Sequence, residues 1–345
     1  MRNVCRYIFI ALVVLSSLCG CKRISLHVRS TRVDLVLDVE LGLDHDISLS
    51  YETNLDKEQQ KKIDGILPSY HEVLFYDRYT HELVTSQIVG STGGQIHIPV
   101  GDYNMVVYSF GTESTQVKDL HNRLEAEAFT SDITRSMADK FKAVQSNVSA
   151  ESKTQSKGYE DDPIVNEPDH IYVANEFDVN IPAFTGKEES VTIYATSKSV
   201  IEVYSLEVLN VSGVKNIEKV DAFVTGQIKS NYFGTPQRNE NPATLYVTLN
   251  TDAQNSRLYT IFGTFGKLPG EENKIYLDIT VTDSGGGQYR YIYDVTDQFD
   301  DPGNTDHKLV IDGGEIDIPD AIAGGGGFAP SVDNWEDEII DLPLG

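Results

Sequence analysis

The chain has 345 residues, a formal net charge of −25 and only three cysteines. A surface this acidic repels other polyanions, which argues against nucleic-acid binding and against docking on anionic lipid headgroups. Eighteen tyrosines and 13 phenylalanines, beside many valines, isoleucines and threonines, indicate β-structure. The length suits two domains of ordinary size behind a leader.

Residues 1–20 have the pattern of a lipoprotein signal peptide. Arg2 and Arg6 form a short basic head, and residues 7–18 form an almost unbroken apolar run. That run is too short to span a bilayer as a stable helix. A leucine and two small residues then precede Cys21, which resembles the lipobox of bacterial lipoproteins, where this cysteine is lipidated and becomes the mature N-terminus.

All three cysteines lie within the first 21 residues. The exported part of the chain therefore has no disulfide, and its stability has to come from packed apolar surface. We expect Cys21 to carry acyl chains, palmitate included, which hold the protein on the outer membrane at the cell surface. The alternative is an ordinary secretory signal that happens to end in a cysteine.

A short tether and a first β-domain are expected after the signal. Residues 21–32 are basic and contain serine, which is typical of a tether. Residues 33–41 alternate apolar and acidic side chains, as a half-buried strand does. We predict an N-terminal β-sandwich over residues 33–181, with further strand candidates at residues 72–76, 82–89, 95–98 and 105–110.

The segment 98–104 carries a recognisable turn. Pro99 and Gly101 redirect the chain into the next strand, and Tyr103 is expected to cap the sandwich edge or enter the core. The order strand, Pro-x-Gly-x-Tyr, strand resembles an element of the transthyretin-like seven-stranded sandwiches found in fimbrillins of Bacteroidales. This resemblance supports a sandwich for the first domain.

Residues 118–162 differ in character from their surroundings. Residues 120–129 and 133–144 predict two short amphipathic helices, and residues 145–162 are poor in apolar side chains, as in a mobile loop. The excursion is either a decoration of the first sandwich or a variable surface loop. Residues 169–181 are expected to return as strand and close the first domain.

A second β-sandwich is predicted over residues 182–320, after a hinge at 182–187. Closely spaced strand candidates with turn residues between them are typical of such a domain. The predicted fold class is therefore all-β with minor helices, as two tandem transthyretin-like or Greek-key β-sandwich domains. The strand candidates are residues 190–196, 199–211, 217–226, 243–249, 257–266, 274–282, 288–295 and 307–311.

No catalytic constellation stands out in the sequence, so we predict a protein that is not an enzyme and has no cofactor. Ser212 to Lys215 fits Ser-x-x-Lys but lacks the partner motifs, and a turn is favoured. The histidines lack metal-ligand spacing. The acidic stretch 297–306 has oxygen ligands for calcium, but its spacing is not that of an EF-hand, so a solvated turn is favoured and no metal site is predicted.

The C-terminal segment 321–345 contains a glycine hinge at 324–327 and an acidic, apolar tail. Three readings of the tail stay open. It folds back as an edge strand of its own domain, it is donated to a groove in another subunit as a donor strand, or it is disordered. The residues that would carry donation are Trp335, Ile339, Ile340 and Leu342.

Taken whole, the chain resembles the fimbrillin-like (type V pilus-like) lipoproteins of Bacteroidales, including a branch with a Trp-bearing acidic C-terminal tail. The residues that carry the resemblance are Cys21, the segment 98–110 and the tail. It implies a non-catalytic fimbrial subunit, or an anchor or accessory component, that acts in adhesion and assembles by strand complementation. Its partners would be the membrane, other fimbrial subunits or a second copy of itself.

The resemblance also implies proteolytic processing after arginine or lysine, which removes an N-terminal strand and opens a groove for the next subunit. Arg29 and Arg32 are the matching positions, with Ile24 to Val28 as the strand removed. Without cleavage, Cys21 stays attached and the protein is an anchor. The alternative function is a glycan-binding surface lipoprotein of a nutrient-uptake system, with a host or glycan ligand, which exposed aromatic clusters on a sandwich edge would favour.

Overall fold

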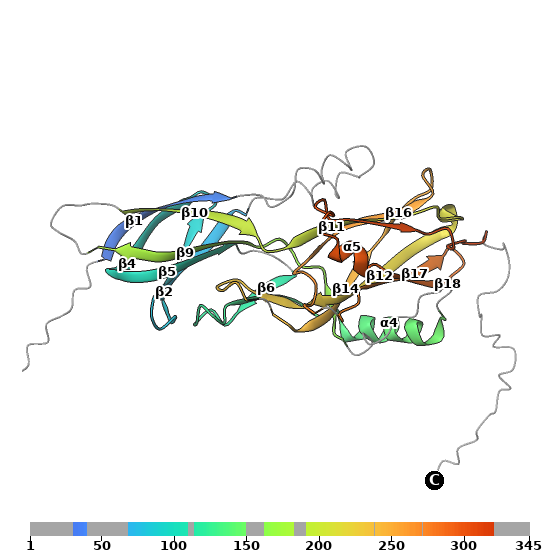
Figure 1. The fold of residues 1–345 in the computed structure, drawn as a ribbon, viewed down its shortest axis with the longest axis horizontal. Coiled ribbons are helices and arrows are strands. Elements are labelled where there is room, and N and C mark those ends of the chain that lie inside the picture. Colours follow the sequence, from blue (N-terminus) through green and yellow to red (C-terminus); the bar gives the residue numbers. More distant parts are fainter. Residues whose placement is uncertain are drawn as a thin grey trace, which may run out of the picture.

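The computed structural model shows a mostly β molecule, and this confirms the predicted all-β class with minor helices. Figure 1 shows an elongated arrangement, with one group of strands toward each end. None of the helices in the described part of the chain is both long and apolar enough to cross a membrane. The structure describes residues 30–39, of which only the backbone is considered, and 68–109, 114–149, 162–182, 191–237, 239–270 and 272–320.

Seven strands form the first sandwich. One layer has β1 between β4 and β10, and the other has the order β3, β2, β5, β9. The layers are joined at two corners by few residue pairs, so that hydrogen bonding closes around the ring. The strands are β1 (Ser30–Val39), β2 (Tyr70–Asp77), β3 (Leu83–Gly90), β4 (Gly93–Pro99), β5 (Gly101–Ser109), β9 (Tyr172–Ile181) and β10 (Val191–Ser199).

The Pro-x-Gly-x-Tyr turn ties the two layers of this sandwich to its core. The Tyr103 ring packs edge-on against Phe75, with ring centroids 5.8 Å apart, and its hydroxyl donates to the Pro99 carbonyl at 3.0 Å. A Cβ at Gly101 would lie 3.0 Å from the Tyr103 hydroxyl oxygen, so the tyrosine closes over a position where glycine fits best. Tyr103 therefore both enters the core and fastens the turn.

The second sandwich packs two sheets around a continuous apolar core. One sheet has the order β18, β17, β12, β14, β8, and the other has the order β15, β16, β11, β19. The elements are β8 (Ile164–Asn166), β11 (Glu202–Leu209), η1 (Val214–Asn216), β12 (Ile217–Ile228), β14 (Pro242–Thr248), β15 (Asn250–Asp252), β16 (Arg257–Thr264), β17 (Tyr276–Asp283), β18 (Gln288–Asp294), α5 (Thr296–Asp300) and β19 (Lys308–Asp312).

A small third sheet links the two sandwiches. It consists of β6 (Thr115–Lys118), β7 (Glu127–Thr130) and β13 (Ser230–Tyr232), in the order β13, β7, β6. The outer faces of β2 and β5 are buried in an apolar cluster together with residues of this sheet and of the second sandwich. Its members include Leu74, Tyr76, Val106, Tyr108, Ala126, Ala128, Phe233 and Phe265.

Helix α4 (Arg135–Asn147) lies beside the second sandwich (Figure 1). The Phe141 ring packs against Phe223 and Tyr246, with ring centroids 4.8 and 5.0 Å away. Thr134 caps the helix N-terminus, because its side chain accepts a hydrogen bond from the Met137 backbone. This helix matches the prediction for residues 133–144.

Several local predictions differ from the structure. The helix expected at 120–129 is instead a turn followed by β7, because this chain segment pairs with β6 and β13. The strand at 190–196, assigned to the second domain, is β10 of the first sandwich, while β8 pairs with β14 of the second. Residue 182 therefore does not divide the strands of the first sandwich from those of the second. Pairing partners far away in the chain decide which sheet a strand joins.

Candidate assembly interface

One of the site residues proposed from the sequence lies in the described chain. Arg32 is the third residue of β1, and its backbone is in register with His97 of β4. The others fall outside the described residues, so their roles stay predictions. These are Cys21 and Arg29 near the N-terminus, and Trp335, Ile339, Ile340 and Leu342 in the tail.

Strand β1 occupies the centre of its layer although it comes first in the chain. It pairs antiparallel with β4 and parallel with β10, in a register that extends from Val33 opposite Val191 to Val39 opposite Ser197. Its backbone thus bonds to neighbours on both sides. Removing β1 would leave two facing strand edges unpaired and would uncover the buried side chains Ile96, Ile98, Ile193 and Ala195. The groove that β1 fills could therefore accept one other β-strand in its place.

The corner between β3 and β4 is closed by a side chain. The two strands form one residue pair, Gly90 with Gly93. Further along, the Gln87 amide donates to the His97 carbonyl and accepts from the His97 backbone N–H at 3.0 Å. The glutamine side chain therefore takes the place of a neighbouring peptide group, and it satisfies the edge of β4.

The corner between β9 and β10 is paired only at one end of the two strands. Ladder pairs between them are Val173 with Lys198 and Tyr172 with Ser199, at one end of both strands. β9 then departs through a bulge, where Asp178 has a φ of +60°. Residues 192–197 of β10 carry no charge, and Tyr194 among them is 73% exposed. Uncharged edge strands favour the addition of another strand.

Burial shifts the pKa of several titratable groups on the strands of the first sandwich, His71 and Glu176 among them. His71 on β2 is fully buried, and this burial lowers its pKa more than its contact with the Gly90 backbone raises it. Desolvation raises the pKa of Glu176 on β9. Both shifts disfavour the charged form of the side chain, so the stability of the first sandwich depends on pH.

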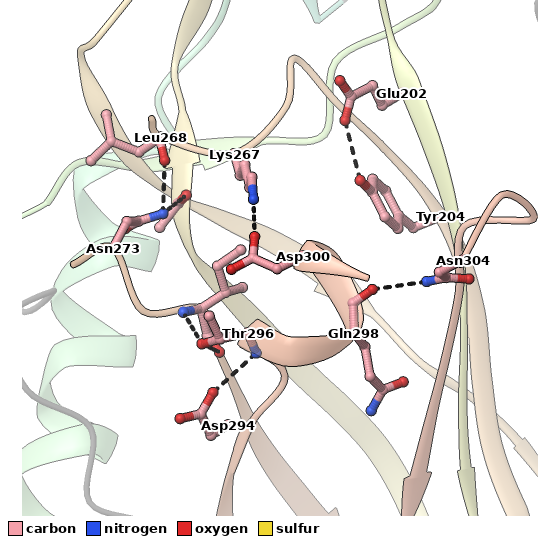
Figure 2. A network of polar contacts seen from close by, with 12 residues as sticks. Glu202, Tyr204, Lys267, Leu268, Asn273, Asp294, Thr296, Gln298, Asp300 and Asn304 are labelled. Atoms are coloured by element: carbon pink, nitrogen blue, oxygen red, sulfur yellow. Dashed lines mark hydrogen bonds and ion pairs between the residues drawn. The ribbon is translucent and has the colours of Figure 1, made fainter. Parts of the chain in front are cut away.

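The acidic stretch 297–306 forms its own local network (Figure 2). Asp300 pairs with Lys267, and Asn304 donates to the Gln298 carbonyl at 3.0 Å. Asp301 accepts from the backbone of Gly303 at 2.8 Å. These contacts direct the polar groups into the turn. In the part of the chain that the structure describes, no group of three histidine, cysteine or acidic residues is placed to hold a metal ion.

The Ser-x-x-Lys segment, residues 212–215, makes structural contacts with residues 316–320. The Ser212 backbone donates to the Ile316 carbonyl at 2.9 Å, and Lys215 pairs with Asp320 at 3.0 Å. Gly213 has a φ of +70°, and a Cβ there would lie 1.9 Å from the Ile318 carbonyl oxygen. The segment therefore fastens the C-terminal end of the second sandwich.

Sequence reasoning missed the β10 edge and Gln87. The strand of β10 was recognised, but its assignment to the second domain concealed that its edge lies next to β1. The available signal was the uncharged run of residues 192–197, but longer uncharged runs occur elsewhere in the chain, for example at 84–101 and 241–251. For Gln87 no local signal exists, because its partner His97 belongs to another strand.

The fold defines a two-sandwich β protein, and a sequence comparison gives its family. Residues 59–248 match the family described as "Domain of unknown function (DUF5119)", so the chain belongs to that family. No curated protein matches its sequence.

Solved structures share the architecture. The crystal structure of a candidate adhesin from Bacteroides ovatus has 19% identity and a TM-score of 0.54, over 85% of this chain and 97% of that one. The fimbrial anchor protein Mfa2 of Porphyromonas gingivalis is similar at 11% identity and a TM-score of 0.45, over 81% and 90% of the two chains. The Bacteroides ovatus structure confirms the resemblance at the level of the fold, and the branch with the Trp-bearing tail stays a prediction.

Proposed function

We propose that this protein is a non-catalytic, lipid-tethered component of a surface adhesion or fimbrial assembly. The observation that carries the proposal is the position of β1, which begins at the end of the expected tether and is the central strand of its layer. A lipid on Cys21 would then attach to the sandwich through a strand bonded on both sides. The fold shared with the candidate adhesin supports an adhesive role.

Within this class we favour an anchor or accessory component. Arg29 precedes β1, so cleavage there leaves the whole strand in place. Cleavage after Arg32 leaves Val33 to Val39, which are the residues that pair with β10. Either cut would separate the lipid from the sandwich without opening the groove. Retaining the lipid therefore goes together with leaving both arginines uncleaved.

Release of β1 needs a cut between β1 and β2. In that interval the sequence offers Lys57, Lys61 and Lys62 as basic positions. A polymerising subunit would be processed there, and a mature form without β1 would have room for a donor strand. A subunit processed in this way has a different mature N-terminus from an anchor. The mass of the mature chain therefore distinguishes the two.

The proposed mode of assembly is the addition of a partner strand at the free edge of β10. Main-chain bonds would supply the affinity and the alternating side chains the specificity. Donation of the chain's own tail, through Trp335, Ile339, Ile340 and Leu342, is the second mode that the sequence allows. Either partner is another fimbrial subunit or a second copy of this chain.

The test is peptide mapping of the protein taken from the outer-membrane fraction. We expect a mature chain that begins at an acylated Cys21 and still contains the peptide of β1. Cys21→Ser should release the protein from the membrane fraction while it still folds. A mature chain that begins after Val39 would overturn the anchor proposal in favour of a polymerising subunit.

A second candidate is a glycan-binding surface lipoprotein. Exposed aromatic side chains on the first sandwich favour it, since Tyr79 is 77% and Phe177 55% exposed. They stand on adjoining parts of the fold, because their chain neighbours Arg78 and Asp178 form an ion pair at 2.8 Å. Aromatic faces of this kind suit the apolar faces of sugars.

A further inference from the structure

Arg123 lies where three parts of the chain meet. It belongs to the turn between β6 and β7, and its backbone N–H donates to the His81 carbonyl in the β2–β3 turn at 2.9 Å. Its Nη1 donates to the carbonyl of Gly234, in the segment after β13. A Cβ at Gly234 would lie 2.0 Å from the Arg123 carbonyl oxygen, so the two backbones pack directly on each other. The arginine is 8% exposed.

This arginine differs from the other two arginines of comparable burial. Arg257 pairs with Glu207 and Asp252, and Arg290 pairs with Asp278. Among the described residues, no carboxylate lies within ion-pair distance of Arg123, although the chain has 53 acidic residues. A buried cation without a counter-charge is costly to the fold.

Two buried polar groups near Arg123 have no hydrogen-bond partner. Its Nε is buried and has no hydrogen-bond partner, and the hydroxyl of the fully buried Tyr76 is in the same condition. The two side chains interact electrostatically, which places them near each other. An N–H of a guanidinium can only donate. The tyrosine hydroxyl can also donate, so an anionic acceptor would serve both groups and would neutralise the charge of the arginine.

One aromatic ring lies over the same guanidinium, and a second exposed ring belongs to the neighbouring β2–β3 turn. Its Cζ lies 5.3 Å from the centroid of the Phe177 ring, and Phe177 is 55% exposed at the bulge of β9. Tyr79, on the β2–β3 turn, is exposed to 77%. The ion pair of Arg78 with Asp178 joins these two elements. A ligand that reaches the cation from solvent therefore meets aromatic side chains.

We propose that Arg123, Phe177 and Tyr79 form a subsite for a carboxylate-bearing saccharide residue such as a uronic acid. The carboxylate accepts hydrogen bonds from the free side of the guanidinium, and the C–H face of the pyranose ring packs on the aromatic rings. A peptide carboxylate satisfies the cation but leaves the exposed rings without a function. The net charge of −25 repels long polyanions, which favours a short or chain-terminal acidic sugar.

The subsite adds a ligand to the proposed surface role and does not depend on the fate of β1. The test is calorimetric titration of the full mature chain with trigalacturonic acid and with its methyl ester, which keeps the sugar faces and removes the charges. We expect the acid to bind at least tenfold more tightly than the ester. Phe177→Ala should weaken binding of the acid at least fivefold, and Tyr194→Ala, at an exposed tyrosine of β10, should leave it unchanged.

Arg123→Lys keeps the charge but loses the fork of donors, and it should weaken binding while the protein still unfolds cooperatively. Three results would overturn the proposal. The first is no binding of the acid, or equal binding of acid and ester. The second is a Phe177→Ala variant that binds as well as the parent chain. The third is N-acetylglutamate binding as tightly as the trisaccharide, which would assign the arginine to a peptide carboxylate instead.

Discussion

The two sandwiches of this protein are held together in different ways. The second has a continuous apolar core and buried ion pairs, such as Arg257 with Glu207 and Arg290 with Asp278. The first is completed by β1, the first described strand of the chain, and its corners have few ladder pairs. From this difference we expect the second sandwich to be the more rigid body and the first to carry the proposed sites for other chains.

The buried ion pairs give the largest expected effect on the second sandwich. Asp278 is fully buried and accepts from Arg290 at 2.6 Å. Asp278→Ala leaves the arginine charge buried without a partner, and we expect a loss of about 4 kcal/mol in the free energy of unfolding, measured in urea. The double variant Asp278→Leu with Arg290→Met should recover most of it. A single variant as stable as the parent would show that the pair does not stabilise this sandwich.

A cavity in the core of the first sandwich should lower the free energy of unfolding by less than the loss of the buried ion pair does. Its effect on amide exchange should be confined to the nearby strands. Ile98 on β4, in the same layer as β1, is fully buried in the apolar core of the first sandwich. We expect Ile98→Ala to cost about 3 kcal/mol and to speed amide exchange in β1, β4 and β10. The matched variant Ile279→Ala, at a fully buried position of β17, should leave exchange in those strands unchanged. Equal exchange patterns in the two variants would remove the distinction between the sandwiches.

The stability of the first sandwich should depend on pH through His71. Burial holds its pKa below the unfolded value of about 6.5, so the unfolded chain binds more protons below that pH. Stability should therefore fall as the pH drops from about 7 towards 5, with a slope of at most about 1.4 kcal/mol per pH unit from this site. His71→Leu should flatten the slope, although His170, whose pKa burial also lowers, keeps part of it. A variant at the exposed His97 serves as control, and an unchanged slope in His71→Leu would contradict the argument.

The smallest effect is expected at the β3–β4 corner. Gln87→Ala removes two hydrogen bonds to the backbone of His97, and we expect a loss of about 1 kcal/mol together with faster exchange of the His97 amide. Ser86→Ala, at the exposed neighbouring position, is the control. If the His97 amide exchanges equally slowly in both variants, the side chain does not close this corner.

Sequence reasoning was most successful where the cause is local. The alternation in β1, the turn at Pro99 and Gly101 and the amphipathic face of α4 all depend on neighbours in the chain. It was wrong for residues 120–129, where pairing with β6 and β13 overrides helical periodicity. It placed β10 in the wrong sandwich because the partner strand is β1, far away in sequence. Arg123 gave no signal, since the missing counter-charge is a property of the folded environment.

The measurement that bears most directly on the central claim is a reversible lock on β1. Asp34 of β1 is in register with Gln95 of β4, and the chain has no cysteine beyond Cys21 to interfere with an introduced pair. In cells that express Asp34→Cys with Gln95→Cys, surface assembly is compared with and without reductant. If β1 stays in place, assembly is equal in the two conditions. Assembly that occurs only after reduction would show that β1 has to leave, and would contradict the anchor account.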